Sequence, residues 1–272
     1  MAIEIDYSGR VVLVTGGTKG VGRGIAQRFA DAGASVVVSA RTAVDDLPSG
    51  WHFLPADLRD GIAAFAMIDA AVGACGRLDV LVNNAGGGPP AETATASPRF
   101  TERVIALNLL SAMFCSQQAN LHMQAQPAGG SIVNIASVCA YRHSPQAAAY
   151  GAAKAGLVNY TKTIAHEWAP KVRANAVIAG QVLTESARQF YGDDDSVARV
   201  AATIPLGRLA DPADIGDVCL YLASPLAAYV TGAAVDAGGG GDRPPFLDAA
   251  AGEGSRANKG APARGLKPRS DG

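Results

Sequence analysis

The sequence of 272 residues has few aromatic side chains, no excess of charge of either sign and no long apolar run. Its 23 Lys and Arg residues nearly balance its 24 Asp and Glu residues. Nucleic-acid-binding proteins usually carry a clear basic excess, so that class is not expected. No apolar run approaches the roughly 18 to 20 residues that cross a bilayer, so no transmembrane helix is expected. The first six residues, MAIEID, lack the basic and apolar regions of a secretory signal, so we expect a cytoplasmic protein.

The sequence also lacks the patterns of a metal site or a disulfide framework. Its cysteines are widely spaced and form no CxxC pair, and its histidines form no metal-ligand pattern with them. We therefore expect no bound metal and four reduced thiols. The residues concerned are Cys75, Cys115, Cys139, Cys219, His52, His122, His143 and His166.

Short apolar segments alternate with helical patterns along most of the chain. The expected strands are residues 11–14, 35–38, 52–55, 78–82, 131–135, 173–178 and 233–235. The expected helices are residues 22–32, 61–73, 101–124 and 150–168, with a further helix from Asp211. Asp211, Pro212 and Asp214 supply an N-cap, a proline at the first helical position and a carboxylate at the third. The pattern predicts a single doubly wound parallel sheet of Rossmann type, with helices on both faces.

The composition predicts one domain with two flanking segments. Residues 1–8 form a lead-in, and residues 9–242 form the Rossmann-type domain. Residues 243–272 are rich in Gly, Ala, Pro and charge, so they cannot bury enough apolar surface to offset the entropy lost on ordering. We expect a flexible C-terminal tail there.

Most chemical information lies in a glycine cluster after the first strand. Gly16 permits a tight turn, Gly20 lets the backbone approach a diphosphate, and Gly22 allows close helix packing. The free N–H groups at the start of the following helix would then meet the negative charge. The strand, loop and helix together predict a nucleotide site.

Further motifs follow the glycine loop, namely Asn83-Asn84-Ala85-Gly86 after the fourth strand, Asn108, Ser137, Tyr150-Gly151-Ala152-Ala153-Lys154, and Thr231-Gly232 followed by Val235-Asp236-Ala237-Gly238-Gly239. With these motifs the chain resembles the short-chain dehydrogenase/reductases, a family of NAD(P)-dependent enzymes. The resemblance covers residues 9–241. It implies four catalytic residues, namely Asn108, Ser137, Tyr150 and Lys154. It implies cofactor contacts from Gly16, Thr18, Lys19, Gly20, Val21, Gly22, Arg41, Asp57, Leu58, Asn84, Ala85, Gly86, Tyr150, Lys154, Gly180 and Thr184.

The end of the second strand favours NADP(H) over NAD(H). Ala40 stands where NAD-dependent relatives carry an acidic residue for the ribose hydroxyls, and Arg41 follows it. Arg41, with Lys19 from the glycine loop, resembles the pair that holds the 2′-phosphate of NADP. Asp57 resembles the family's adenine contact; alternatively, it caps the helix that begins near Gly61.

Tyr150 and Lys154 lie four residues apart and so share one helix face. The phenol has an ordinary pKa of about 10, which a nearby ammonium and a positive nicotinamide ring would lower toward the working range. By resemblance, Lys154 also holds the nicotinamide ribose, and Ser137 hydrogen-bonds the substrate oxygen. Asn108 would hold a water that links Lys154 to solvent.

One departure from the family concerns the segment after the sixth strand. Ala179 replaces the usual proline before Gly180, so we expect a more mobile loop there, with Thr184 still able to reach the cofactor. Residues 181–206, with Phe190 and Tyr191, are expected to form a lid. The substrate pocket is expected to be lined by this segment, by residues 87–89, and by Val138, Cys139 and Tyr141.

The main hypothesis is an oxidoreductase that moves a hydride between NADP(H) and a carbonyl or secondary alcohol. A 3-oxoacyl thioester reductase is the alternative with the same chemistry, and a non-catalytic nucleotide-binding regulator is the alternative of another class. The two long helices carry apolar or small residues on more than one face, and in relatives they pair across a twofold axis. We therefore expect a homotetramer, with a homodimer as the alternative.

Overall fold

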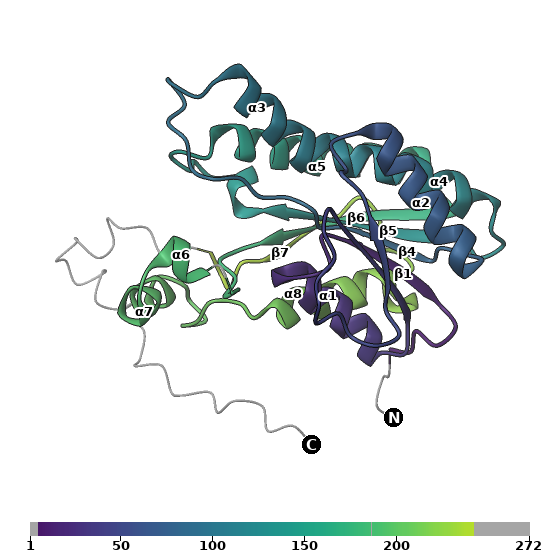
Figure 1. Cartoon of the computed structure of the whole chain (residues 1–272). Helices are drawn as coiled ribbons and strands as arrows, with labels where there is room; N and C mark the ends of the chain where they lie inside the picture. Colours follow the sequence, from purple (N-terminus) through teal and green to yellow (C-terminus); the bar gives the residue numbers. More distant parts are fainter. Residues whose placement is uncertain (1–4, 186, 242–272) are drawn as a thin grey trace.

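The computed structural model describes residues 5–185 and 187–241 and contains one seven-stranded parallel sheet (Figure 1). The strand order is β3-β2-β1-β4-β5-β6-β7, which confirms the predicted doubly wound arrangement. The strands are β1 (Val11–Thr15), β2 (Ser35–Ala40), β3 (His52–Pro55), β4 (Val80–Asn83), β5 (Gly130–Ser137), β6 (Val172–Ala179) and β7 (Ala234–Ala237). The predicted tail at 243–272 and the first four residues of the lead-in lie outside the described residues.

Helices cover both faces of the sheet (Figure 1). One layer contains α2 (Gly61–Cys75), α4 (Ser111–Ala125) and α5 (Ala148–Glu167), and the other contains α1 (Gly20–Asp31) and α8 (Pro212–Ala223). Three shorter helices lie toward the end of the sheet where the strands finish, namely α3 (Pro98–Ile105), α6 (Ala187–Tyr191) and α7 (Asp194–Ala202). In the part of the chain that is described, no helix has both the length and the apolar character to cross a membrane.

The central strand β1 is apolar from Val11 to Val14 because both of its faces are covered. Val12 and Val14 belong to the core beneath α1 and α8, whereas Val11 and Leu13 belong to the core beneath α2 and α4. All four are buried. Side chains of a strand alternate between faces, so a continuous apolar run is the pattern that a doubly covered strand requires.

The start of α8 has the predicted capping box. The Asp211 side chain accepts a hydrogen bond from the Ala213 N–H at 2.9 Å, and the Asp214 side chain accepts one from the Asp211 N–H at 2.7 Å. Pro212 occupies the first turn, where a missing N–H leaves no bond unmade.

The helix expected over residues 101–124 is not one regular helix. It begins earlier, at Pro98 after the cap Ser97, and its two α-helical parts are joined by a π-helical turn (Ala106–Leu110). A π turn has no simple signature in residue periodicity, and such turns often occur at functional sites. This turn contains Asn108, which is buried, with only 1% of its surface exposed.

Candidate active site

The glycine loop and the Asn84–Ala85 turn are joined by backbone and side-chain hydrogen bonds. The Asn84 side chain donates to the carbonyl oxygens of Thr15 and Gly16, at 3.0 and 3.3 Å. The Thr15 hydroxyl accepts from the N–H groups of Asn84 and Ala85, both at 3.0 Å. Two predicted cofactor segments from different strands therefore form one rigid edge.

Glycine is required in this loop for space as well as for conformation. Gly16 has a φ of 65°, and a Cβ on Gly22 would lie 2.2 Å from the Gly16 carbonyl oxygen. Any side chain at Gly22 would push α1 away from the loop. The loop can thus bring backbone N–H groups close to a ligand.

The N-terminus of α1 already binds an anionic group of the chain itself. The Gly20 N–H donates to the carboxylate of Glu185 at 3.1 Å, and Thr184 lies beside Gly20. Free N–H groups and the helix dipole favour negative charge at this position. A carboxylate held here indicates that this helix start favours a negatively charged oxygen. Glu185 was not among the predicted site residues.

A cavity of about 530 Å³ brings together much of the predicted cofactor site. Its lining includes six predicted residues, Gly16, Arg41, Asp57, Leu58, Ala85 and Gly86. Ser39 also lines it, and the buried Ser39 hydroxyl has no hydrogen-bond partner among the described residues. Such an orphaned polar atom fits a site built for a polar ligand. Lys19 is exposed at the start of α1 and does not line this cavity.

Arg59 is a residue of this cavity that the sequence analysis missed. Its guanidinium donates to the Asp57 carboxylate at 2.8 Å, and this bond lowers the pKa of Asp57 to about 2. The cap of α2 is Asp60, which accepts from the N–H groups of Ile62 and Ala63. The alternative that Asp57 caps this helix is therefore wrong. The signal for Arg59 in the sequence was a basic residue, in addition to Arg41, two positions after Asp57.

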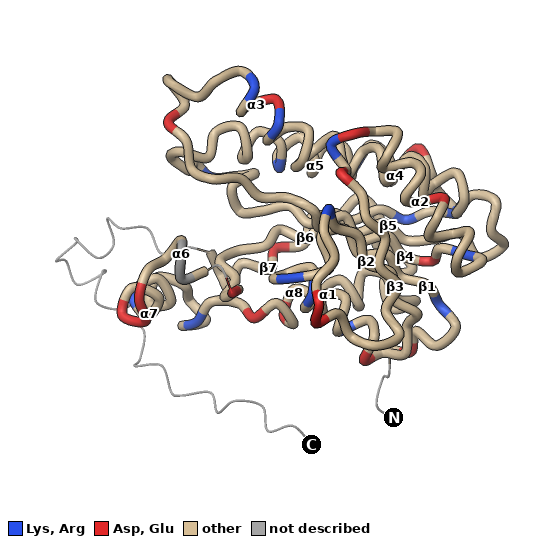
Figure 2. The backbone as a smooth tube through the Cα atoms, viewed as in Figure 1, with Lys and Arg blue, Asp and Glu red and all other residues tan. Residues whose placement is uncertain are grey.

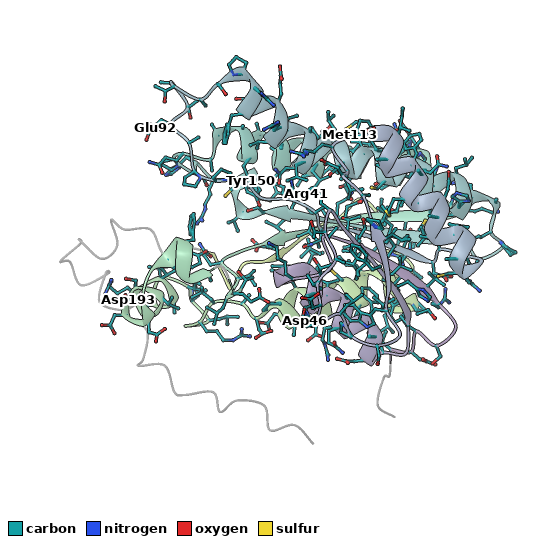
Figure 3. The ribbon with its side chains drawn as sticks, in the orientation of Figure 1. Arg41, Asp46, Glu92, Met113, Tyr150 and Asp193 are labelled. Atoms are coloured by element: carbon teal, nitrogen blue, oxygen red, sulfur yellow. The ribbon has the colours of Figure 1, made fainter. Side chains whose placement is uncertain are left out.

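The four predicted catalytic residues lie at the carboxyl end of the sheet, where Figure 3 labels Tyr150. Lys154 lies one turn after Tyr150 on α5, and its ammonium is 5.7 Å from the centre of the Tyr150 ring. The ammonium donates to the Ile135 carbonyl oxygen at 2.7 Å. Ser137 ends β5, and its side chain opposes the rise that burial causes in the pKa of Tyr150. The strand end and the helix face thus place three reactive groups together.

Asn108 completes the group by holding the turn after β4. Its side-chain oxygen accepts from the Gly87 N–H at 2.7 Å, and its amide donates to the Gly87 carbonyl at 2.9 Å. A Cβ on Gly86 would lie 2.7 Å from the Asn108 oxygen and 3.3 Å from the Lys154 ammonium. Gly86 therefore keeps open the space between these two side chains.

Burial dominates the pKa values of the catalytic pair. It lowers the pKa of Lys154 to about 8 and raises the pKa of Tyr150, with Ser137 opposing the rise for Tyr150. The expected lowering of the Tyr150 pKa is therefore not a property of the protein chain alone. The positive charge of an oxidised nicotinamide ring is a necessary part of that expectation.

The buried ammonium predicts a particular pH dependence of stability. Lys154 loses its proton near pH 8 in the folded chain but near its ordinary pKa of 10.5 in the unfolded chain. Below pH 8, folding must bury the charged ammonium, which lowers the free energy of unfolding. This loss becomes smaller as the pH rises from 8 toward 10.5, because the folded chain then holds the neutral amine. Between pH 7 and pH 10, wild type should therefore gain roughly 2 to 3 kcal/mol of unfolding free energy relative to Lys154→Met. Denaturant unfolding at both pH values measures this, with the exposed Lys162 on the same helix as control (Lys162→Met). Parallel pH profiles for wild type and Lys154→Met would contradict it.

A second cavity, of about 790 Å³, opens beside Tyr150. Gly88, Pro89, Cys139 and Phe190 line it as predicted, whereas Val138 and Tyr141 do not. Most of its wall comes from residues 90–105 and 145–152, which were not predicted. Apart from the alanine run at 147–149, these wall residues carry no distinctive signal in the sequence.

The predicted lid segment contains α6 and α7. The Asp193 side chain accepts from the Ser196 N–H at 2.9 Å and so caps α7. The acidic residues visible at the start of α7 in Figure 2 are thus the first turn of a helix. Ala179, which precedes this segment, pairs with β7 within the sheet. Inside the segment, the Leu183 N–H donates to the Ala210 carbonyl at 2.8 Å. A Cβ on Gly180 would lie 2.7 Å from the Gly238 Cα, so this position requires glycine.

In the described ranges, no group of three or more His, Cys, Asp and Glu side chains could hold a metal. The four cysteines are free thiols, and Cys115 and Cys219 are buried. The polar groups of the candidate active site are arranged around the two cavities at the carboxyl end of the sheet.

Comparison with known proteins agrees with this geometry. The family model described as enoyl-(acyl carrier protein) reductase matches residues 16–241. The chain is 35% identical over 245 residues to 2-dehydro-3-deoxy-D-gluconate 5-dehydrogenase of Escherichia coli strain K12, covering 86% of this chain and 96% of that enzyme.

Solved structures are similar over the same extent. The ligand-free aldohexose dehydrogenase of Thermoplasma acidophilum has a TM-score of 0.81 and 30% identity, covering 86% of this chain and 94% of the other. The NADP active-site complex of Pseudomonas aeruginosa RhlG has a TM-score of 0.81 and 30% identity, covering 88% and 99%. The chain is thus an oxidoreductase that belongs to the short-chain dehydrogenase/reductase family.

Proposed function

We propose that this protein transfers a hydride between NADP(H) and a carbonyl or secondary alcohol substrate. The observation that carries the proposal is the grouping of Ser137, Tyr150 and Lys154 around the Gly86 turn, directly beside the glycine loop. When bound, the nicotinamide ring supplies or accepts the hydride. The two cavities meet at Gly88 and Pro89, so a nucleotide in one would reach a substrate in the other.

The protein groups move the proton and orient the reactants. As the carbonyl carbon receives the hydride, the Tyr150 hydroxyl donates its proton to the carbonyl oxygen. Ser137 hydrogen-bonds the same oxygen as charge develops on it. Lys154, held by the Ile135 carbonyl, would hold the ribose hydroxyls and favour the phenolate that remains.

In this proposal, Asn108 acts by holding neighbouring backbone groups in place. Its side chain is fully used by the Gly87 peptide and the Val104 carbonyl. It therefore fixes the turn that separates the two cavities. The expected role of Asn108 in holding a water that links Lys154 to solvent stays a prediction.

The charge of the smaller cavity supports NADP(H) as the preferred cofactor. Arg41 lines it beside Ser39 and Ala40, so the end of β2 places no carboxylate against a 2′-phosphate, and Arg59 lines it while hydrogen-bonded to Asp57. Guanidinium groups bind phosphate through two parallel hydrogen bonds. The NADP complex of the Pseudomonas aeruginosa relative is consistent with this choice.

Activity measurements separate the three candidate functions. NADPH oxidation by wild type with a panel of ketones, and with an acetoacetyl thioester, should exceed that of Tyr150→Phe. Preferred turnover of the thioester would favour the 3-oxoacyl thioester reductase. Equal, negligible oxidation by both proteins would favour the non-catalytic regulator.

The outer face of the helix layer supports assembly into an oligomer. Ala155 is exposed on α5, and the half-buried Met113, labelled in Figure 3, lies on the neighbouring α4. Tyr229 and Leu226, near the last strand, are also exposed. We propose a homotetramer, with a homodimer as the alternative. Light scattering at micromolar concentration should give a multiple of 27.6 kDa, and a mass of one subunit would contradict the proposal. The cytoplasmic location stays a prediction.

A further inference from the structure

The cavity beside Tyr150 is large enough to indicate a class of substrate. Its volume is about 790 Å³, and its wall is formed by the segment from Gly88 through α3, by the start of α5, and by Phe190 of α6. Cavities of this size enclose most of the surface of a molecule with tens of atoms. The cavity therefore has room for much more than a carbonyl group and its two neighbouring carbons.

The wall is mostly hydrocarbon. Pro89, Ala96, Phe100, Val104, Ile105 and Ala149 are typical of it, and none of its described lining residues carries a formal charge. In Figure 2 the loop between β4 and α3 is uncharged except for one acidic position, which the sequence identifies as Glu92, a residue that does not line the cavity. Arg142 and His143, the basic residue types nearest Ser137 in sequence, are exposed and do not line the cavity.

Polar atoms at the rim are used to hold the two wall segments together. The Gln146 amide donates to the Glu92 carboxylate at 3.0 Å, and the Gln146 carbonyl accepts from the Ala91 N–H at 2.9 Å. Gln146 has a φ of 66°, a strained conformation for a residue other than glycine. Cys139 is also engaged, because its sulfur accepts from the Ser144 hydroxyl at 3.2 Å. These groups are therefore already hydrogen-bonded without a substrate.

Phe190 leaves an apolar ring exposed at this wall. The residue is 73% exposed although it lines the cavity, and its ring meets Tyr191 edge-to-face at 5.1 Å between centroids. Burying such a ring against another apolar group is favourable. A hydrocarbon substituent in the cavity would provide that group.

We propose that the substrate is a bulky, uncharged ketone or secondary alcohol with a mainly hydrocarbon substituent, which packs against Phe100, Val104 and Phe190. This inference rests on the proposed function, because the reacting oxygen is placed at Tyr150. The wall offers no charged group and few hydroxyls, chiefly those of Thr93, Thr101 and Tyr150, so a carboxylate or several hydroxyl groups in the cavity would lose more hydration than the wall replaces. Sugar acids and free sugars are therefore poor substrates.

The first test compares substrates of equal length and different polarity. With NADPH, kcat/KM for methyl ketones from butanone to decanone should rise about fourfold for each added methylene until the cavity is full. Ketones with a carboxylate at the far end of the same chain should be at least tenfold poorer than the uncharged ketones. Equal or better turnover of the keto acids, or of an aldohexose with NADP, would overturn the inference while leaving the proposed function intact.

The second test does not depend on turnover. Calorimetric titration of NADPH-loaded Tyr150→Phe with the same ketones should show a dissociation constant that falls with chain length. Adding Phe190→Ala should weaken decanone binding about tenfold and butanone binding little. The control Ile62→Ala removes an equally apolar, exposed side chain on α2, away from the cavity, and should change neither. Dissociation constants independent of chain length would overturn the inference. If no compound is turned over by wild type, the proposed function fails and this binding series still decides the inference.

Discussion

In Tyr150→Phe, kcat should fall by a factor of about 10² to 10⁴, whereas the affinity for NADPH should equal that of wild type. The substitution removes one hydroxyl from a ring that lies at the meeting point of Ser137 and Lys154. Binding should survive because the ring remains and the glycine loop and the arginines are untouched. Steady-state kinetics with a ketone, and NADPH titration followed by fluorescence, measure the two effects separately.

Tyr141→Phe is the matched control for this substitution. Tyr141 is 63% exposed, follows the same strand as Ser137 and does not line the cavity, so the loss of its hydroxyl should leave kcat unchanged. A loss of less than tenfold for Tyr150→Phe would remove Tyr150 from the role of general acid and base.

Arg41→Ala should narrow the preference for NADPH over NADH by roughly 1.5 to 3 kcal/mol, the range for a hydrogen bond to a charged group. This corresponds to a change of about 10- to 150-fold in the ratio of dissociation constants. Raised salt should weaken NADPH binding more than NADH binding, because only NADPH has the additional phosphate. Ala40→Asp should go further and favour NADH, since a carboxylate there repels phosphate and accepts from ribose hydroxyls.

Arg103→Ala controls for the loss of one positive charge from the same cavity. Arg103 lines the cavity from α3, on the other side from the loop after β2. Its loss should change the affinities for both cofactors by the same factor. Tighter binding of NADH than NADPH by wild type would contradict the interpretation of Ala40 and Arg41.

Much of the fold could be predicted because its signals are local. The Asp211–Asp214 box fixes the start of α8, and the continuous apolar run of β1 predicts a strand covered on both faces. The π-helical turn at Asn108 could not be predicted, because it depends on hydrogen bonds from Asn108 to a turn 21 residues away. Tertiary contacts, rather than periodicity, decide such a turn.

The reactive part of the site was more predictable than its walls. Ser137, Tyr150 and Lys154 could be predicted from their resemblance to the family's motifs, in which the chemistry requires those residue types. The apolar cavity needs only small or apolar residues, and many sequences satisfy that need, so residues such as Phe100 and Ile105 carry no distinctive signal. Glu185 meets the glycine loop from 165 positions away, a contact that only the folded chain shows.

Isotope transfer tests the central claim most directly. NADPH carrying deuterium at the reactive nicotinamide carbon is incubated with wild type and a bulky methyl ketone, and the product alcohol is analysed by mass spectrometry. We predict one deuterium on the former carbonyl carbon and none on the oxygen after exchange with water, since the oxygen receives its proton from Tyr150. NADPH oxidation that yields an alcohol without deuterium, or no alcohol, would contradict direct hydride transfer at this site.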